Sequence, residues 1–139
     1  MGIRLWLIFA SHTFLMEATE KKKTLILGAS ANPRRYSYLA LDRLRNAGHE
    51  VVAIGKKNAV VKDVQIDTEQ KPYTNVHTVT LYLNPLHQKE YYNYILSLQP
   101  KRIIFNPGTE NEELYRMATD HAIKAQEACT LVLLSTGQY

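Results

Sequence analysis

The segment Thr24–Ser37 constrains the fold of this chain more than any other. It begins as an apolar run, turns through Gly-Ala-Ser at residues 28–30, and leaves through Asn32-Pro33 into a stretch with helical spacing. This order predicts a buried strand, a tight loop of small residues and the first turn of a helix. A helix N-terminus carries unpaired N–H groups and a partial positive charge, so it attracts phosphate. Because Arg34 and Arg35 add formal charge at the same end, we interpret the segment as a phosphate-binding loop.

Length and composition indicate one ordinary globular domain. The chain has 139 residues, of which 45% are apolar and 22% charged, and this is enough to bury a core without disulfides. Cys129 is the only cysteine, so no disulfide can form within the chain. No His or Cys spacing suggests a metal site. The net charge of +4 is modest and its positive residues are mostly dispersed, so we expect no nucleic-acid partner.

The N-terminus allows two interpretations. An apolar run at Leu5–Ala10 follows one arginine, which is a faint signal-peptide pattern, but polar residues at 11 and 12 interrupt it. The run is too short to span a bilayer, so we expect no membrane segment. Our preferred hypothesis is that Met16 begins the functional chain. Residues 1–21 are then a flexible extension or a start-site artefact, residues 22–139 form the domain, and the protein is cytoplasmic.

Alternating strand and helix patterns predict an α/β fold of three layers, Rossmann-like, with a mainly parallel sheet flanked by helices. Asn32 is expected to cap the first helix, with Pro33 at its first position. The expected strands are 23–27, 49–54, 76–83, 102–105 and 123–127, and the expected helices are 34–47 or 35–47, 86–98 and 110–122. Residues 60–66 could add a short edge strand, and 131–134 could form a strand or a terminal helical turn. Ligands of such sheets bind outside the carboxyl ends of the strands, where the strand order reverses.

The loop departs from the dinucleotide fingerprint G-x-G-x-x-G. Only Gly28 is present, and Ser30 and Pro33 occupy the other two glycine positions. The second strand ends before Lys56 and Lys57, where a dinucleotide site normally has an acid that holds a ribose hydroxyl. A lysine pair suits a phosphorylated ribose instead. NAD is therefore disfavoured, while NADP with its 2′-phosphate and coenzyme A with its 3′-phosphate both remain.

Several motifs, taken in order, resemble the small bacterial CoA-binding domain family. They are the loop at 28–30, the Asn-Pro-Arg-Arg segment at 32–35 with Ser37, the Gly-His-Glu-Val-Val run at 48–52, the strand 79–83, the segment 106–113 (Asn-Pro-Gly-Thr-Glu-Asn-Glu-Glu) and the Ala128-Cys129 pair. The resemblance covers residues 22–139. It implies the Rossmann-like fold that this family shares with the N-terminal CoA-binding domain of succinate–CoA ligase alpha subunits.

The resemblance also implies roles for individual residues. The loop backbone would approach the pyrophosphate, one arginine would pair with phosphate, and the lysines would lie near the ribose phosphate or adenine. The two Asn-Pro segments would line the cleft for the pantetheine arm. The cofactor-binding residues expected on this basis are Gly28, Ala29, Ser30, Asn32, Arg34, Arg35, Ser37, Lys56, Lys57, Asn84, Pro85, Asn106, Pro107 and Gly108.

The functional hypothesis is a non-catalytic module that binds a small nucleotide ligand, coenzyme A or an acyl-CoA. No nucleophile–base pair emerges, and we expect no counterpart of the phosphohistidine-bearing domain of the ligases. One alternative is an NADP-dependent oxidoreductase, although Tyr-x-x-x-Lys spacing is missing near Lys89. Another is a regulatory subunit that senses nucleotides through a partner.

Three further features have mainly structural interpretations. Cys129 is expected to be a small core residue. His121 falls on an apolar helix face and is expected to be partly buried. The tyrosines Tyr91, Tyr92 and Tyr94 surround one expected helix and cannot all face its core side. They therefore suggest a ligand contact, a homo-oligomer or a protein partner.

Overall fold

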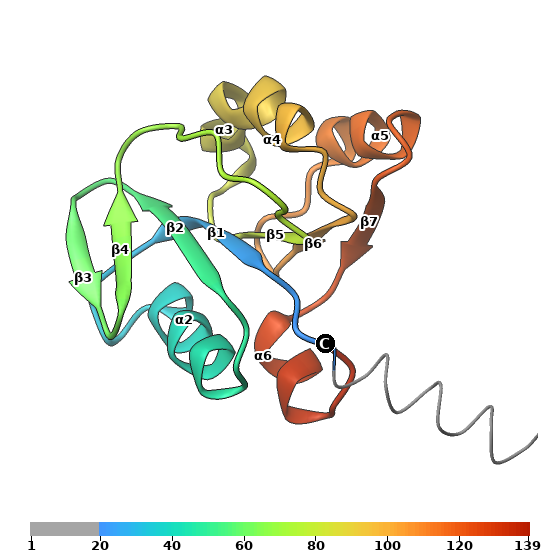
Figure 1. Ribbon diagram of the computed structural model, residues 1–139. Coiled ribbons are helices and arrows are strands. Elements are labelled where there is room, and N and C mark those ends of the chain that lie inside the picture. Colours follow the sequence, from blue (N-terminus) through green and yellow to red (C-terminus); the bar gives the residue numbers. More distant parts are fainter. Residues whose placement is uncertain (1–19) are drawn as a thin grey trace, which may run out of the picture.

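The computed structural model describes residues 20–139, so the expectations about Met16 and a signal peptide lie outside the described residues. Its centre is a seven-stranded sheet in the order β3-β4-β2-β1-β5-β6-β7 (Figure 1). The strands are β1 (Thr24–Ala29), β2 (Val51–Gly55), β3 (Ala59–Val61), β4 (Val64–Asp67), β5 (Thr78–Leu81), β6 (Arg102–Phe105) and β7 (Lys124–Glu127). The helices are α2 (Tyr36–Asn46), α3 (Pro85–Gln88), the 3₁₀ turn η1 (Lys89–Tyr91), α4 (Tyr92–Leu98), α5 (Glu112–Asp120) and α6 (Thr130–Ser135).

The sheet is parallel except at one edge, where β3 and β4 form an antiparallel hairpin. β1 lies in the middle, with β2 on one side and β5 on the other, so the strand order reverses at β1. A reversal of this kind is where open α/β sheets bind ligands. The predicted α/β, Rossmann-like fold is confirmed.

Helices cover both faces of the sheet. In Figure 1, α2 and α6 lie on one face, and α3, α4 and α5 lie on the other. A hydrophobic core lies on each face of the sheet, and β1 contributes to both. Leu25 and Leu27 pack on the face that carries α4 and α5, and Ile26 packs on the face that carries α2 and α6. These three side chains are fully buried, and burial of one such side chain contributes about 1.5–3 kcal/mol. The strand that leads into the predicted phosphate loop is therefore firmly held.

The first helix begins later than the sequence predicts. Its N-cap is Arg35, so the expected cap at Asn32 is wrong. The Asn32 carbonyl accepts from the Arg35 N–H at 3.0 Å, and its side-chain oxygen accepts from the Arg34 N–H at 3.0 Å. Asn followed by Pro suits the first two positions of a turn as well as a helix start, and here the turn forms.

Helix α2 packs on the sheet through one face. Tyr36 is 71% exposed, whereas Ser37, Ala40, Leu41 and Leu44 are buried.

The expected helix at 86–98 is interrupted, since η1 separates α3 from α4. The segment 131–134 belongs to helix α6, and the suggested edge strand is the hairpin of β3 and β4.

The tyrosine group does not form an outward surface. Tyr92 and Tyr94 are each 8% exposed and Tyr91 is half-buried, so all three pack into the core on one face of the sheet. The expectation that they could not all face inward is wrong. At about 3.6 residues per turn, positions 91 and 94 lie on the same side of a helix and position 92 lies next to them, so one wide buried face holds all three. This removes the observation that suggested a partner contact there.

Candidate functional site

The carboxyl ends of six parallel strands, β4, β2, β1, β5, β6 and β7, lie along the same end of the sheet, here called the carboxyl edge. The segment after β1 contains Ser30–Arg35, and the segment after β2 contains Lys56 and Lys57. The segment after β5 contains Asn84-Pro85, and the segment after β6 contains residues 106–108. The expected binding residues therefore come from four neighbouring strands and gather at the same edge.

Two glycines allow the backbones to approach closely at this edge. Gly28 has φ +91°, and a Cβ there would lie 2.9 Å from the carbonyl carbon of Tyr82. The Tyr82 N–H donates to the Leu27 carbonyl at 2.8 Å, which draws the segment after β5 against β1. A Cβ on Gly55 would lie 2.2 Å from the Ala29 carbonyl oxygen. Only glycine fits at either position without a backbone shift.

The loop after β1 leaves hydrogen-bond donors at the edge. The Ser30 hydroxyl accepts from the Asn32 N–H at 3.0 Å, so its own proton remains available to donate to an acceptor. Arg34 and Arg35 are exposed in the turn before α2. No side chain caps α2. The Arg35 N–H donates to the Asn32 carbonyl and the Tyr38 N–H to the Arg35 carbonyl, so the first-turn N–H groups of residues 36 and 37 are those that precede the backbone bonds of the helix. Ser37, in contrast, is 4% exposed and lies on the buried face of α2.

Lys56 and Lys57 are exposed just after β2. The sequence shows no acid at this point, but the fold brings one close, because Asp67 pairs in register with Ile54 on the neighbouring strand. Asp67 accepts from the Tyr73 hydroxyl at 2.6 Å and pairs with the Lys71 ammonium at 3.0 Å. These contacts hold the pKa of the Asp67 carboxyl below its usual value, the bond from Tyr73 having the largest effect. The acid was missed because β4 was not recognised as a parallel neighbour of β2.

The two Asn-Pro segments differ in what their asparagine side chains do. Asn84 is exposed and caps α3 by accepting from the His87 N–H at 3.0 Å, with Pro85 at the first helical position. Asn106 is 3% exposed. Its amide donates to the Thr80 hydroxyl at 2.7 Å and to the Leu81 carbonyl at 2.9 Å, and its oxygen accepts from the Thr130 N–H at 2.9 Å. The Asn106 side chain therefore ties β5, β6 and α6 together, while Pro107 and Gly108 are exposed.

Sequence reasoning missed two amides at this edge. Gln88 is fully buried and bonds to the segments after β5 and β6, and Asn111 bonds to Gln88 and caps α5. The sequence pattern placed Gln88 in a helix and gave it no further role. Its amide nitrogen donates to backbone carbonyls, and a sequence pattern cannot identify such partners. The Asn-Glu-Glu run at 111–113 was a cap signal that could have identified Asn111.

Other groups with reactive side chains have structural surroundings. Cys129 is a free, half-buried cysteine at the N-cap of α6. Burial raises the pKa of the Tyr82 phenol above its ordinary value, so the phenol is neutral at physiological pH. His121 is exposed, which contradicts the expected partial burial; its ring contacts the Met117 carbonyl at 2.8 Å. Within residues 20–139, no three His, Cys, Asp or Glu side chains are grouped as metal ligands.

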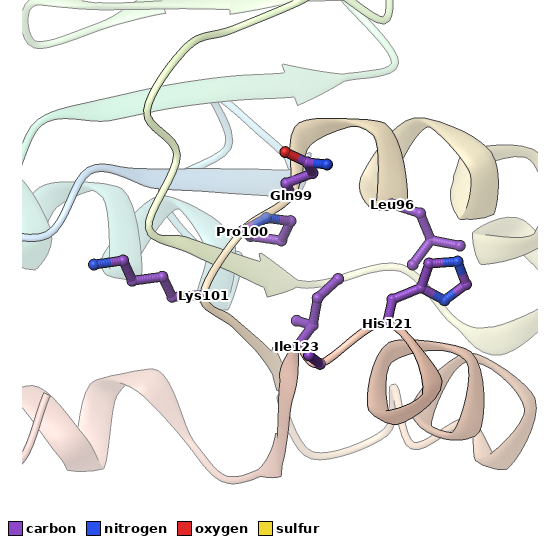
Figure 2. Close-up of a pocket in the computed structure, with 7 residues that line it drawn as sticks. Leu96, Gln99, Pro100, Lys101, His121 and Ile123 are labelled. Atoms are coloured by element: carbon purple, nitrogen blue, oxygen red, sulfur yellow. The ribbon is translucent and has the colours of Figure 1, made fainter.

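A surface hollow lies at the opposite end of the sheet, where the amino ends of β6 and β7 begin. Its lining residues are Leu96, Gln99, Pro100, Lys101, His121, Ala122 and Ile123. Figure 2 shows Lys101 extending away from the Leu96 and Ile123 side chains. None of the expected binding residues lines this hollow, and the strand order does not reverse there. In the described part of the chain, no helix is long and apolar enough to cross a membrane.

The profile of a CoA binding domain family matches residues 22–135. The chain belongs to this family. Family membership confirms the resemblance found in the sequence and supports a CoA-related small-molecule ligand. No curated protein matches the chain.

Solved structures agree with the fold. A crystal structure of an uncharacterized protein is 51% identical, with a TM-score of 0.84, and the match covers 86% of this chain and 99% of that one. A hypothetical protein from Pyrococcus horikoshii OT3 is 22% identical, with a TM-score of 0.75 and 89% of each chain covered. The structure of Prb, a PH1109 protein redesigned for binding, is 16% identical, with a TM-score of 0.77; the match covers 91% of this chain and 90% of that one. The last two likenesses concern the fold alone.

Proposed function

We propose that this domain binds coenzyme A or an acyl-CoA at the carboxyl edge, without catalysing a reaction itself. One observation carries the proposal: the small-residue loop, the uncapped start of α2 and two exposed arginines coincide where the strand order reverses. Such an arrangement suits a phosphorylated ligand. The family profile supports coenzyme A over other phosphorylated ligands. A cytoplasmic location is part of the same proposal.

The ligand is assigned to the edge as follows. The backbone at residues 28–30 approaches the pyrophosphate, and the Ser30 hydroxyl donates to a phosphate oxygen. Arg34 or Arg35 pairs with phosphate, and Asn32 holds the turn that presents them. Lys56 or Lys57 lies near the ribose phosphate. The arm follows Asn84-Pro85 and the backbone of residues 106–108, since the Asn106 side chain is bonded internally.

Thermal unfolding with added ligands tests the proposal directly. A ligand that binds only the folded state at a hundred times its Kd stabilises it by about 2.7 kcal/mol. For a domain of this size we expect the melting temperature to rise by roughly 5–15 °C with coenzyme A or acetyl-CoA. NAD and ATP serve as controls. NADP is the competing ligand, because the lysine pair suits a 2′-phosphate equally; a rise with NADP and none with coenzyme A would refute the proposal.

The arginines provide a second test. Arg34→Ala or Arg35→Ala removes one charge-assisted bond to phosphate, which is worth about 1.5–3 kcal/mol. The affinity for coenzyme A, measured by titration calorimetry, should fall roughly tenfold to a hundredfold in one of the two variants. Arg43→Ala is the matched control, because Arg43 lies in the last turn of the same helix. If both single variants bind as tightly as the parent, the phosphate assignment is wrong.

A further inference from the structure

Gln88 is a buried polar side chain whose bonds all lead to the candidate site. Its side chain is fully buried at the end of α3. Its amide nitrogen donates to the Leu83 carbonyl at 2.8 Å and to the Thr109 carbonyl at 2.8 Å. Its oxygen accepts from the Asn111 amide at 2.9 Å. Both amide protons and the oxygen therefore have partners within the protein.

The two carbonyls belong to different segments of the carboxyl edge. Leu83 immediately precedes Asn84-Pro85, and Thr109 immediately follows residues 106–108. The turn at 106–109 is closed by Thr109 itself, whose N–H and hydroxyl donate to the Asn106 carbonyl at 2.9 and 2.8 Å. One glutamine amide thus joins the two segments that the proposed function assigns to the pantetheine arm.

Asn111 extends this connection into the neighbouring helices. Its amide also donates to the Tyr92 hydroxyl at 2.8 Å, and its oxygen caps α5 by accepting from the Glu113 and Leu114 N–H groups. The network therefore connects the segments after β5 and β6 with each other and with α4 and α5, which opposes independent movement of the two segments. Segments that are already ordered lose less conformational entropy when a ligand binds.

We propose that Gln88 is a positioning residue for the arm of the ligand: it holds the segments after β5 and β6 at the spacing that accepts the arm. The inference rests on the proposed function. It makes a specific prediction about which part of the ligand is affected. The phosphate loop after β1 has no bond to Gln88 among the described contacts, so the adenosine end should bind independently of it.

The test compares coenzyme A with adenosine 3′,5′-bisphosphate, which lacks the arm. Gln88→Leu keeps the approximate volume of the side chain but removes every bond. We expect it to weaken coenzyme A about tenfold or more, and to change the affinity for the bisphosphate less than about twofold. Binding is measured by calorimetry well below the melting temperature of each variant.

A second variant covers the case in which Gln88→Leu does not fold. Asn111→Ser retains an oxygen that can cap α5 but removes the bond to Gln88, so it should produce the same selective loss, only smaller. Tyr94→Phe is the stability control. It removes a part-buried bond, from the Tyr94 hydroxyl to the Lys71 carbonyl, on the same face of the sheet but away from the two segments that Gln88 joins.

The outcomes separate the two proposals. If the parent protein binds neither ligand, the proposed function fails. If the parent binds both, but the Gln88 and Asn111 variants keep full affinity for coenzyme A, the positioning role is wrong. It is equally wrong if both ligands weaken together, or if Tyr94→Phe produces the same selective loss. Loss of coenzyme A affinity alone, in the Gln88 and Asn111 variants alone, supports it.

Discussion

Single residues at the carboxyl edge are constrained by the space around them as much as by their chemistry. Gly55 and Gly108 illustrate two different constraints. The position of Gly55 is crowded, because a Cβ would meet the Ala29 carbonyl oxygen at 2.2 Å. A Cβ at Gly108 would meet no atom within 4 Å, but the φ of +90° at this position is one that other residues rarely adopt. One glycine is required by packing and the other by backbone conformation.

Substitutions by alanine should separate these two constraints. Gly55→Ala forces β1 and β2 apart at the phosphate loop, so we expect a loss of about 2–4 kcal/mol in the free energy of unfolding, together with weaker binding of coenzyme A. Gly108→Ala meets only backbone strain and should cost about 1 kcal/mol. Urea denaturation measures both. Equal losses in the two variants would show that the close approach at Gly55 relaxes easily.

At the scale of elements, the connection from β4 to β5 is unusual for a parallel sheet. Residues 68–77 form no helix, although the chain must return from the carboxyl end of β4 to the amino end of β5. Side chains anchor this segment instead. Tyr73 donates to Asp67, Gln70 donates to the Glu90 carbonyl, and Tyr94 donates to the Lys71 carbonyl. Figure 1 shows the segment crossing the face that carries α3 and α4.

The bond between Tyr73 and Asp67 predicts a stability difference that depends on pH. The pKa of Asp67 is lowered in the folded protein, so its contribution is present above the ordinary value of 3.8 and is lost as the pH falls through the folded-state pKa. Tyr73→Phe should therefore cost about 1–2 kcal/mol at pH 7, and less at pH 3. Urea denaturation at the two pH values measures this difference. Tyr115→Phe, at a 40% exposed position, is the control.

At the scale of the whole molecule, the two ends of the sheet carry different kinds of residues. The carboxyl edge gathers exposed donors and cations, whereas the opposite edge contains a closed cluster around Tyr139. The Tyr139 hydroxyl bonds to Thr24, its ring lies 4.9 Å from the His49 ring, and the Arg102 guanidinium lies 4.3 Å above it. These contacts join Tyr139 to β1, to the segment just before β2 and to β6.

His49 makes this cluster sensitive to acid. It is 6% exposed, and its Nδ1 accepts from the Lys22 N–H at 2.9 Å. Burial lowers its pKa from 6.5 to about 4, and the nearby charges of Lys21, Lys22, Arg102 and His77 add to the effect. Because the folded state resists protonation, the stabilising contribution is complete above pH 6.5 and is lost as the pH falls toward 4.

The expected outcome is a loss of up to about 3 kcal/mol between pH 7 and pH 4 from this group. His49→Gln should be less stable than the parent at pH 7 but lose less stability over that range. His121→Gln, at an exposed position, should follow the parent. Chemical denaturation across the range tests this; a parallel decline in the parent and in His49→Gln would contradict the assignment.

The sequence alone determined the layers of this protein and the edge at which its candidate site lies. The strands could be predicted because apolar runs and flanking turn residues are local features of the sequence. Arg102–Phe105 matches the expected strand, and the expected segments after β1, β2, β5 and β6 lie at one edge because parallel strands must end together. The family resemblance was also visible in those segments.

The tertiary structure alone decided what individual polar side chains do. Asn32 holds a turn rather than capping a helix, the Asn106 amide is bonded inside the protein, and Gln88 joins two segments of the edge. Asp67 becomes a neighbour of β2 only through strand pairing. The reason is physical: a hydrogen bond depends on which donor and acceptor the packed chain brings within about 3 Å, and those partners are often distant in sequence.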